Sequence, residues 1–259
     1  MKRSILVSLL VLTSVFAIVT VLPESVSAVT RYVGGAGPGN YTTIQTAVNA
    51  ANPGDTVYVY GGIYRENIVV TKSVFLNGES RETTIIDGHN GPEGILFAAN
   101  SATVSGFTIT NGYPGIRIGA VDNCVVSSNI ISNGYRGIDV FDTDGTVIVD
   151  NIISSNGYNG IELSTSGNAH VANNVVSSNE RSGIYMDSSV GNTIENNFVS
   201  SNQWGIYLDS SSSNDIVGNT AWSNYYDRSP SWGSGIWLVY SSSNRIEGNT
   251  ASSNYRTGI

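Results

Sequence analysis

The stretch Gly183–Asn202, GIYMDSSVGNTIENNFVSSN, is followed by a near copy in Gly205–Asn224, GIYLDSSSSNDIVGNTAWSN. Both stretches begin with Gly-Ile-Tyr, carry an Asn fourteen residues after the glycine, and end with a second Asn five residues later. Self-similarity at a period of 20 to 50 residues is the sequence signature of a protein built from stacked copies of one unit. This stretch therefore predicts a repeat architecture.

The pattern continues on both sides of this pair. Gly-Ile anchors recur in steps of 22, 23, 23, 22, 30 and 23 residues, at Gly115, Gly137, Gly160, Gly183, Gly205, Gly235 and Gly258. The first six anchors are each followed after fourteen residues by an asparagine, at Asn129, Asn151, Asn174, Asn197, Asn219 and Asn249. Because the chain stops just after the last anchor, the pattern indicates either a further coil or another pairing partner at that edge.

Each repeat contains three short runs of alternating apolar residues, which predict three short strands. Such a unit is too short for a propeller blade or a βα unit, and it contains too few leucines for a leucine-rich repeat. A coil of three strands that pair in parallel with the next coil, about 4.8 Å away, satisfies the pattern. The apolar columns would then fill the interior, and the Asn column would form a ladder of side-chain amides at a turn.

The N-terminal part of the repeat domain predicts one helix. Residues 42–51 contain a candidate capping box, Thr42 and Gln45, and apolar residues at helical spacing. We expect this helix to cover the N-terminal end of an all-β solenoid domain that spans residues 29–259, with regular coils over 94–257.

Residues 1–28 are interpreted as a signal peptide, because a basic start precedes a long apolar run and Val26-Ser27-Ala28 resembles a cleavage site. An uncleaved membrane anchor is the alternative. Without these residues the chain has 10 basic and 19 acidic residues, a net charge of −9. This charge argues against nucleic acid as a partner. A secreted, extracellular or cell-surface location is expected, or a periplasmic one if the source has two membranes, with no membrane span after cleavage.

The segment TTIQTAVNAANPGDTVYVYGGIYRENIVV, followed by SVFLNGE and the downstream Gly-Ile and Asn repeats, resembles the right-handed parallel β-helix superfamily with the pectin-lyase-like fold. Within it, the sequence is most similar to the NosD-type β-helix proteins, over about residues 30–259. The resemblance implies the fold. It leaves the activity open, because this fold occurs in lyases, glycosidases, esterases, adhesins and passive stalks.

One outward column is the candidate site. The residue two positions after each anchor predicts a surface column that is charged at one end and aromatic at the other, formed by Arg117, Asp139, Glu162, Tyr185, Tyr207 and Trp237. Asp187 and Asp209 flank the aromatic end. Aromatic faces bind the apolar face of a sugar ring and carboxylates accept its hydroxyl groups, so Arg117, Tyr185, Asp187, Tyr207, Asp209 and Trp237 are candidate substrate-binding residues. The alternative is an aromatic column that only stabilises the sheet.

Asp139 and Glu162 are the candidate catalytic residues. They occupy neighbouring coils, so their carboxyl groups could approach within the roughly 5–9 Å of paired-acid glycosidases. The resemblance to β-helix lyases, which use a basic residue and aspartate-held calcium, implies a further possibility, with calcium at Asp139, Asp142 and Asp144. A solvated charged face is the alternative.

The NosD resemblance also implies a link to copper delivery for nitrous oxide reductase. His89, His170, Met186 and Cys124 are the copper-type ligands of the mature chain, and they are scattered over different coils. We therefore expect a carbohydrate-interacting or structural envelope module without established catalysis, with a polysaccharide lyase or glycosidase, or a copper-accessory protein, as alternatives.

Overall fold

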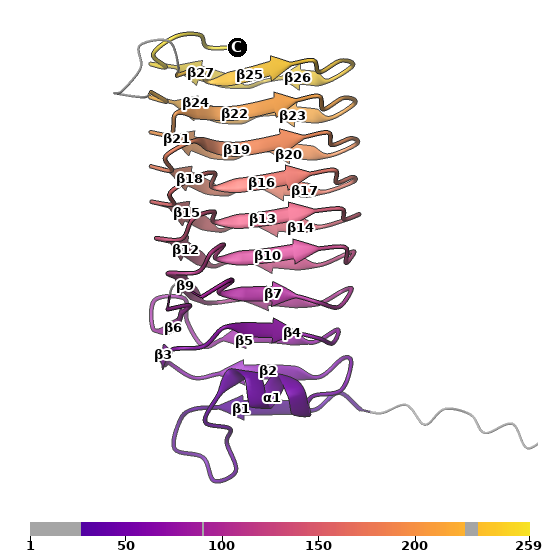
Figure 1. Ribbon diagram of the computed structural model, residues 1–259, viewed down its shortest axis with the longest axis vertical. Coiled ribbons are helices and arrows are strands. Elements are labelled where there is room, and N and C mark those ends of the chain that lie inside the picture. The colour runs from indigo at the N-terminus through magenta and orange to yellow at the C-terminus, as the bar shows by residue number, and fades with distance from the viewer. Residues whose placement is uncertain (1–26, 90, 226–232) are drawn as a thin grey trace, which may run out of the picture.

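The computed structural model describes residues 27–89, 91–225 and 233–259. The proposed signal peptide therefore lies almost wholly outside the described residues. Successive strands wind around one axis, and each complete coil contributes one strand to each of three parallel sheets, as Figure 1 shows. The molecule is thus a right-handed parallel β-helix, as the repeat predicts. No helix in the described ranges is long and apolar enough to cross a membrane.

The first two sheets form two sides of the solenoid. Sheet A contains β1 (Thr30–Val33), β2 (Thr56–Val59), β5 (Phe75–Gly78), β8 (Thr103–Ser105), β11 (Val125–Ser127), β14 (Val147–Val149), β17 (His170–Ala172), β20 (Thr193–Glu195), β23 (Asp215–Val217) and β26 (Arg245–Glu247). Sheet B contains β3 (Gly62–Tyr64), β6 (Thr84–Asp87), β9 (Thr108–Thr110), β12 (Ile130–Ser132), β15 (Ile152–Ser154), β18 (Val175–Ser177), β21 (Phe198–Ser200), β24 (Thr220–Trp222) and β27 (Thr250–Ser252).

Sheet C forms the third side and carries the candidate site. It contains β4 (Ile68–Val70), β7 (Ile95–Phe97), β10 (Ile116–Gly119), β13 (Ile138–Phe141), β16 (Ile161–Ser164), β19 (Ser182–Asp187), β22 (Trp204–Asp209) and β25 (Ile236–Val239). Its strands are three to six residues long. Because all its neighbours pair in parallel and in register, equivalent residues of successive coils lie side by side.

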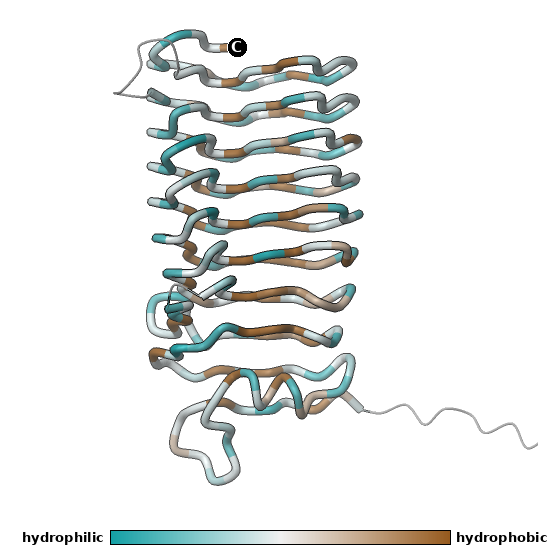
Figure 2. The backbone as a smooth tube through the Cα atoms, in the orientation of Figure 1, coloured by the Kyte–Doolittle hydropathy of each residue, from teal (hydrophilic) through white to brown (hydrophobic). Residues whose placement is uncertain are grey.

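The interior is filled by one face of every strand. In sheet C the apolar core residues of β13 are Ile138 and Val140, and sheets A and B add residues such as Ile148 and Ile153 from the same coil. Hydrophobic and hydrophilic residues accordingly alternate along the strands in Figure 2. Burial of apolar area is the main contribution to folding here, since the described part of the chain contains no disulfide.

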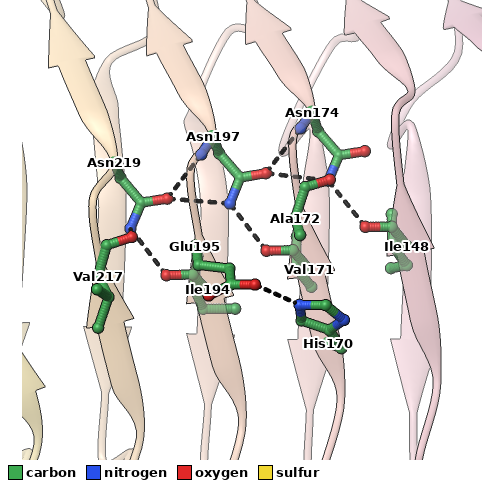
Figure 3. A network of polar contacts seen from close by, with 10 residues as sticks. All are labelled: Ile148, His170, Val171, Ala172, Asn174, Ile194, Glu195, Asn197, Val217 and Asn219. Carbon is green, nitrogen blue, oxygen red and sulfur yellow. Dashed lines mark hydrogen bonds and ion pairs between the residues drawn. The ribbon is translucent and has the colours of Figure 1, made fainter.

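The predicted asparagine ladder is present and has two companions. In the first ladder the backbone N–H and side-chain amide of each Asn donate to Oδ1 of the next; for Asn174 and Asn197 these distances are 2.9 and 3.0 Å (Figure 3). The side-chain amide also donates to a backbone carbonyl, so the corner of each coil is saturated with hydrogen bonds. A second ladder joins Asn156, Asn179, Asn202, Asn224 and Asn254. A third joins Asn192, Asn214 and Asn244.

The residue before each asparagine of the first ladder adopts a left-handed backbone conformation. Its φ angle is 57° at Ser128, 58° at Asp150 and 56° at Asn173. Gly218 occupies the equivalent position in a later coil, with φ of 65°. Asparagine, aspartate and glycine tolerate this conformation better than other residues, which explains the Asp-Asn, Asn-Asn and Gly-Asn corners; Ser128 is the exception.

The anchor glycines are required by close packing of neighbouring coils. A Cβ atom on Gly115 would lie 2.7 Å from Cγ2 of Ile131 and 2.9 Å from the carbonyl oxygen of Gly137, the next anchor. No side chain fits in that space without displacing backbone. The repeated Gly-Ile thus marks the point where each coil turns tightly into sheet C.

The N-terminal helix α1 (Ile44–Ala50) contacts β1, β2 and β4 and buries Ile44, Ala47 and Val48. It lies at the N-terminal end of the coils, as Figure 1 shows. The predicted capping box is wrong, because Thr43, and not Thr42, is the N-cap. The backbone N–H groups of Ile44 and Gln45 donate to Glu66 at 2.9 and 3.0 Å, so a carboxylate distant in sequence satisfies two donors of the first helical turn.

Candidate functional site

The structure places the six predicted column residues side by side on the outer face of sheet C. Arg117 pairs in register with Asp139, Asp139 with Glu162, and the register continues through the aromatic residues. We call Arg117, Asp139 and Glu162 the charged segment, and Tyr185, Tyr207 and Trp237 the aromatic segment. The alternation of each strand, with its neighbours pointing into the core, positions these side chains outward.

The charged segment is a chain of ion pairs. Arg117 lies 3.1 Å (Nη2) from Oδ2 of Asp139 and 3.6 Å (Nε) from Oε1 of Glu93. Arg136, from the turn before β13, lies 2.6 Å (Nε) from Oε2 of Glu162 and 4.0 Å (Nη1) from Oδ2 of Asp139. Two arginines therefore alternate with three carboxylates.

Both candidate catalytic carboxyl groups are buried beneath these arginines. Asp139 is 7% exposed and Glu162 is 8% exposed. Glu162 also accepts a hydrogen bond from Asn159 at 2.8 Å. Burial raises the pKa of Asp139 above its ordinary value; Arg136 and Arg117 act against this effect, and Glu162 adds to it. The structure thus brings the two acids together, but it engages both of them with cations.

The aromatic segment is a continuous surface of rings. The ring centroids of Tyr185 and Tyr207 are 5.2 Å apart, and those of Tyr207 and Trp237 are 5.7 Å apart. Trp204, at the start of β22, joins them at 5.4 Å from Tyr207 and 5.9 Å from Trp237. The rings of the column are half-buried, whereas Trp204 is 6% exposed.

Asp187 and Asp209 lie in register beside the aromatic segment, as predicted. Burial raises the pKa of Tyr185 to about 12, and the carboxylates of Asp187 and Asp209 add to this effect. Burial likewise raises the pKa of Tyr207, with Asp209 acting in the same direction and Arg181 opposing it. Both phenols therefore remain neutral hydrogen-bond donors over the whole physiological range of pH.

A second column, not predicted, runs along the corner that leads into sheet C. Tyr113, Tyr135 and Tyr158 stack with centroids 4.5 and 5.1 Å apart. The guanidinium carbon of Arg136 lies 5.3 and 5.1 Å from the ring centroids of Tyr135 and Tyr158. Arg181 continues this corner column at 4.7 Å from the centroid of Tyr158 and 5.7 Å from that of Trp204. The corner column therefore reaches the aromatic segment at Trp204.

A hollow of about 410 Å³ opens where the two columns meet. Its lining residues come from the corners of three successive coils and include aromatic, cationic, anionic and amide side chains: Gly157, Tyr158, Glu180, Arg181, Gln203 and Trp204. Concave sites with aromatic walls and a few polar groups are the usual places of ligand binding.

The predicted calcium ligands do not form one site. Asp139 is buried among arginines, whereas Asp142 and Asp144 are exposed at the far end of β13. Asp144 accepts a hydrogen bond from Asn168. In the part of the chain that the structure describes, no group of three or more His, Cys, Asp or Glu residues could hold a metal ion.

Comparison with known families decides the relationship. The model of the family described as "Periplasmic copper-binding protein (NosD)" matches residues 48–231, most of the chain. The chain belongs to the NosD family. The β-helix of this NosD-family chain agrees with the resemblance inferred from the sequence.

Carbohydrate-active proteins share its fold. The catalytic domain of a GH87 alpha-1,3-glucanase in complex with nigerose superposes with a TM-score of 0.61 and 12% identity, over 82% of this chain and 44% of that one. The pectin methylesterase PemA from Erwinia chrysanthemi gives 0.56 and 15%, over 74% and 78%. A curated relative, the probable pectinesterase/pectinesterase inhibitor 6 of Arabidopsis thaliana, is 41% identical over 76 residues, which span 26% of this chain and 14% of that protein.

The copper-type ligands of this NosD-family chain do not converge. Cys124 and Met186 are both completely buried in the core. Nε2 of His170 lies 2.9 Å from Oε1 of Glu195 on sheet A (Figure 3), and His89 is exposed in a turn. The described residues therefore do not fit a shared copper site.

The sequence analysis missed Arg136, Arg181, Trp204 and the tyrosines of the corner column. Apart from Trp204, which begins β22, these residues lie in the turns just before the strands of sheet C, where strand alternation does not predict side-chain positions. A sequence signal for the corner column does exist, because Asn-Gly-Tyr recurs at residues 111–113, 133–135 and 156–158. Its period equals that of the Gly-Ile anchors.

Proposed function

We propose that this chain binds a polysaccharide along the outer face of sheet C. The observation that carries the proposal is the aromatic segment, a run of neighbouring half-buried rings flanked by Asp187 and Asp209. Rings of this kind bind the apolar faces of sugars, and the carboxylates and phenols exchange hydrogen bonds with hydroxyl groups. The polysaccharide-active proteins that share the fold support this class of ligand. The family description supports a location in the periplasm.

The contacts of the charged segment support binding rather than cleavage. A general acid must reach the glycosidic oxygen with its proton, and a nucleophile or base must be free to act. Asp139 and Glu162 are both shielded from solvent and paired with Arg117 and Arg136. An ion-paired network of this kind holds the coils together and leaves recognition to the rings.

Affinity electrophoresis of the purified protein in gels that contain neutral or acidic polysaccharides tests the proposal. We expect retardation in at least one gel, and a loss of affinity of about 10- to 100-fold in Trp237→Ala. Trp222→Ala is the matched control, because Trp222 is exposed on sheet B, away from the site. Equal losses in both variants, or no retardation in any gel, would contradict a glycan site on sheet C.

A polysaccharide lyase or glycosidase is the second candidate. It is favoured by the register of Asp139 and Glu162 and by the raised pKa of Asp139, which general acid catalysis requires. Mass spectrometry of the same polysaccharides after incubation, with and without calcium, detects new chain ends. New ends that disappear in Asp139→Asn and Glu162→Gln would establish catalysis, whereas intact chains would exclude it for those substrates.

Copper handling is the third candidate, and it depends on the family description alone. Elemental analysis of the protein after exposure to copper and gel filtration tests it. Because the described ligands do not converge, we expect no stoichiometric copper.

A further inference from the structure

The hollow beside Arg181 lies next to the aromatic segment and is walled by rings. Tyr158 and Trp204 line it, and Trp204 also contacts Tyr207 and Trp237. A ligand that lies on the aromatic segment therefore has one neighbouring recess on the corner side. The recess is formed by side chains of the corner column and not by the strand faces.

Arg181 differs from the arginines of the charged segment, because no described carboxylate forms an ion pair with it. Arg117 and Arg136 each form ion pairs, whereas Arg181 forms none within the described part of the chain. Its Nη1 donates to the hydroxyl group of Tyr158, and its guanidinium plane lies against the rings of Tyr158 and Trp204. The stacking fixes the side chain, so its remaining N–H groups form a held donor set.

Gln203 adds an unused donor to the same recess. Its side chain is 5% exposed, and its Nε2 atom has no hydrogen-bond partner among the residues that the structure describes. A buried amide nitrogen without an acceptor is unfavourable, so an oxygen atom that enters this recess with a ligand would gain a hydrogen bond from it. Glu180, the acidic residue of the lining, is exposed, so water screens its charge.

We propose that this hollow binds a carboxylate group on a sugar residue of the glycan. The inference rests on the proposed function and names its ligand more closely, as a polysaccharide that carries acidic sugars. The oxygens of the sugar carboxylate would accept charge-assisted hydrogen bonds from the Arg181 guanidinium. They would also accept a hydrogen bond from Nε2 of Gln203. The ring of that sugar would pack between Tyr158 and Trp204.

Matched ligands separate charge recognition from stacking. Uronate-bearing polysaccharides are compared one by one with their own carboxyl-reduced forms, in which each acidic sugar becomes the neutral sugar with unchanged linkages. Affinity electrophoresis of wild type, Arg181→Gln and Trp237→Ala is run with both forms. Arg245→Gln, which removes an exposed arginine of sheet A, controls for the loss of one positive charge.

We expect wild type to bind at least one acidic form roughly tenfold more tightly than its reduced form. Arg181→Gln should lose this preference and keep its affinity for the reduced form, whereas Trp237→Ala should weaken both forms. Equal affinity of wild type for both forms, or a preference that survives in Arg181→Gln, overturns the inference and leaves the proposed function intact. If neither form of any polysaccharide binds, both are overturned.

Discussion

The charged and aromatic segments of sheet C share one backbone and differ in their side chains. Both lie on strands of the same sheet in unbroken register, above the same apolar interior. In the charged segment the side chains satisfy one another through ion pairs. In the aromatic segment the tilted rings contact one another, and the rings and the flanking carboxylates remain partly exposed. The same backbone can therefore carry a surface whose charged groups pair with one another or a surface available to a ligand. Only the outward side chains decide which.

Removal of Arg136 should have the largest effect on stability. Arg136→Ala would leave Glu162 and Asp139 without their shared cation while both remain buried. Breaking a buried pair from one side costs roughly 3–5 kcal/mol of unfolding free energy. Urea denaturation followed by circular dichroism measures it. The control Arg245→Ala removes an exposed pair and should cost less than about 1 kcal/mol. Similar losses in the two variants would show that the charged segment is not a closed network.

The asparagine ladder should respond equally in the coils that carry the two segments. Asn151→Ala and Asn197→Ala each remove a side-chain hydrogen bond to the next asparagine of the ladder and another to a backbone carbonyl. Leaving such partners unpaired costs roughly 1–3 kcal/mol. The two variants should therefore agree within about 0.5 kcal/mol in urea denaturation. A large disagreement would mean that the outer surface changes the strength of the frame.

The aromatic segment should contribute less to folding stability than the charged segment or the asparagine ladder. Tyr207→Ala removes contacts with the rings on either side, which are worth about 1 kcal/mol. The triple variant that also carries Tyr185→Ala and Trp237→Ala should still unfold cooperatively, as circular dichroism can show. If the triple variant fails to fold, the rings of the aromatic segment are needed for folding, which contradicts their assignment as a ligand-binding surface.

Alkaline pH should lower the free energy of unfolding through Tyr185. Below pH 10 Tyr185 is neutral in both the folded and unfolded states, so it adds no pH dependence. As pH rises from 10 toward about 12, the unfolded state loses this proton first, and stability falls. Tyr185→Phe should flatten that part of the stability curve measured by urea denaturation. Equal flattening in Tyr240→Phe, a side chain that is 88% exposed, would remove the explanation.

The sequence predicts the structure well at positions that have the same packing or hydrogen-bonding role in every coil. Gly115 and its equivalents must avoid a side chain because neighbouring coils nearly touch there. Asn174 and its equivalents must supply both a donor and an acceptor to the ladder. Such demands repeat with the coil, so the period alone predicts the fold and the outward column.

Contacts between turns and strands could not be predicted in the same way. Arg136 contacts a carboxylate on the next coil and one on the strand that follows it, and neither contact follows from strand alternation. Glu66 caps a helix that precedes it by more than twenty residues. Both depend on where a long side chain ends in space, which only the assembled coils determine. The two candidate catalytic acids, Asp139 and Glu162, therefore lie in a network of ion pairs that strand alternation did not predict.

The corner after the second asparagine has a consequence for how such chains change. The step from Gly205 to Gly235 is 30 residues, against 22 or 23 in the preceding coils, yet Asn224 still donates to Asn254 at 3.0 Å. Extra residues at this corner thus leave the rungs on either side aligned. A duplicated coil would lengthen the molecule by about 4.8 Å, and a grafted loop would not lengthen it at all. Duplication of a coil and insertion of a loop are therefore independent changes. The first lengthens the solenoid and the second alters one corner, so either can be engineered without redesigning the rest.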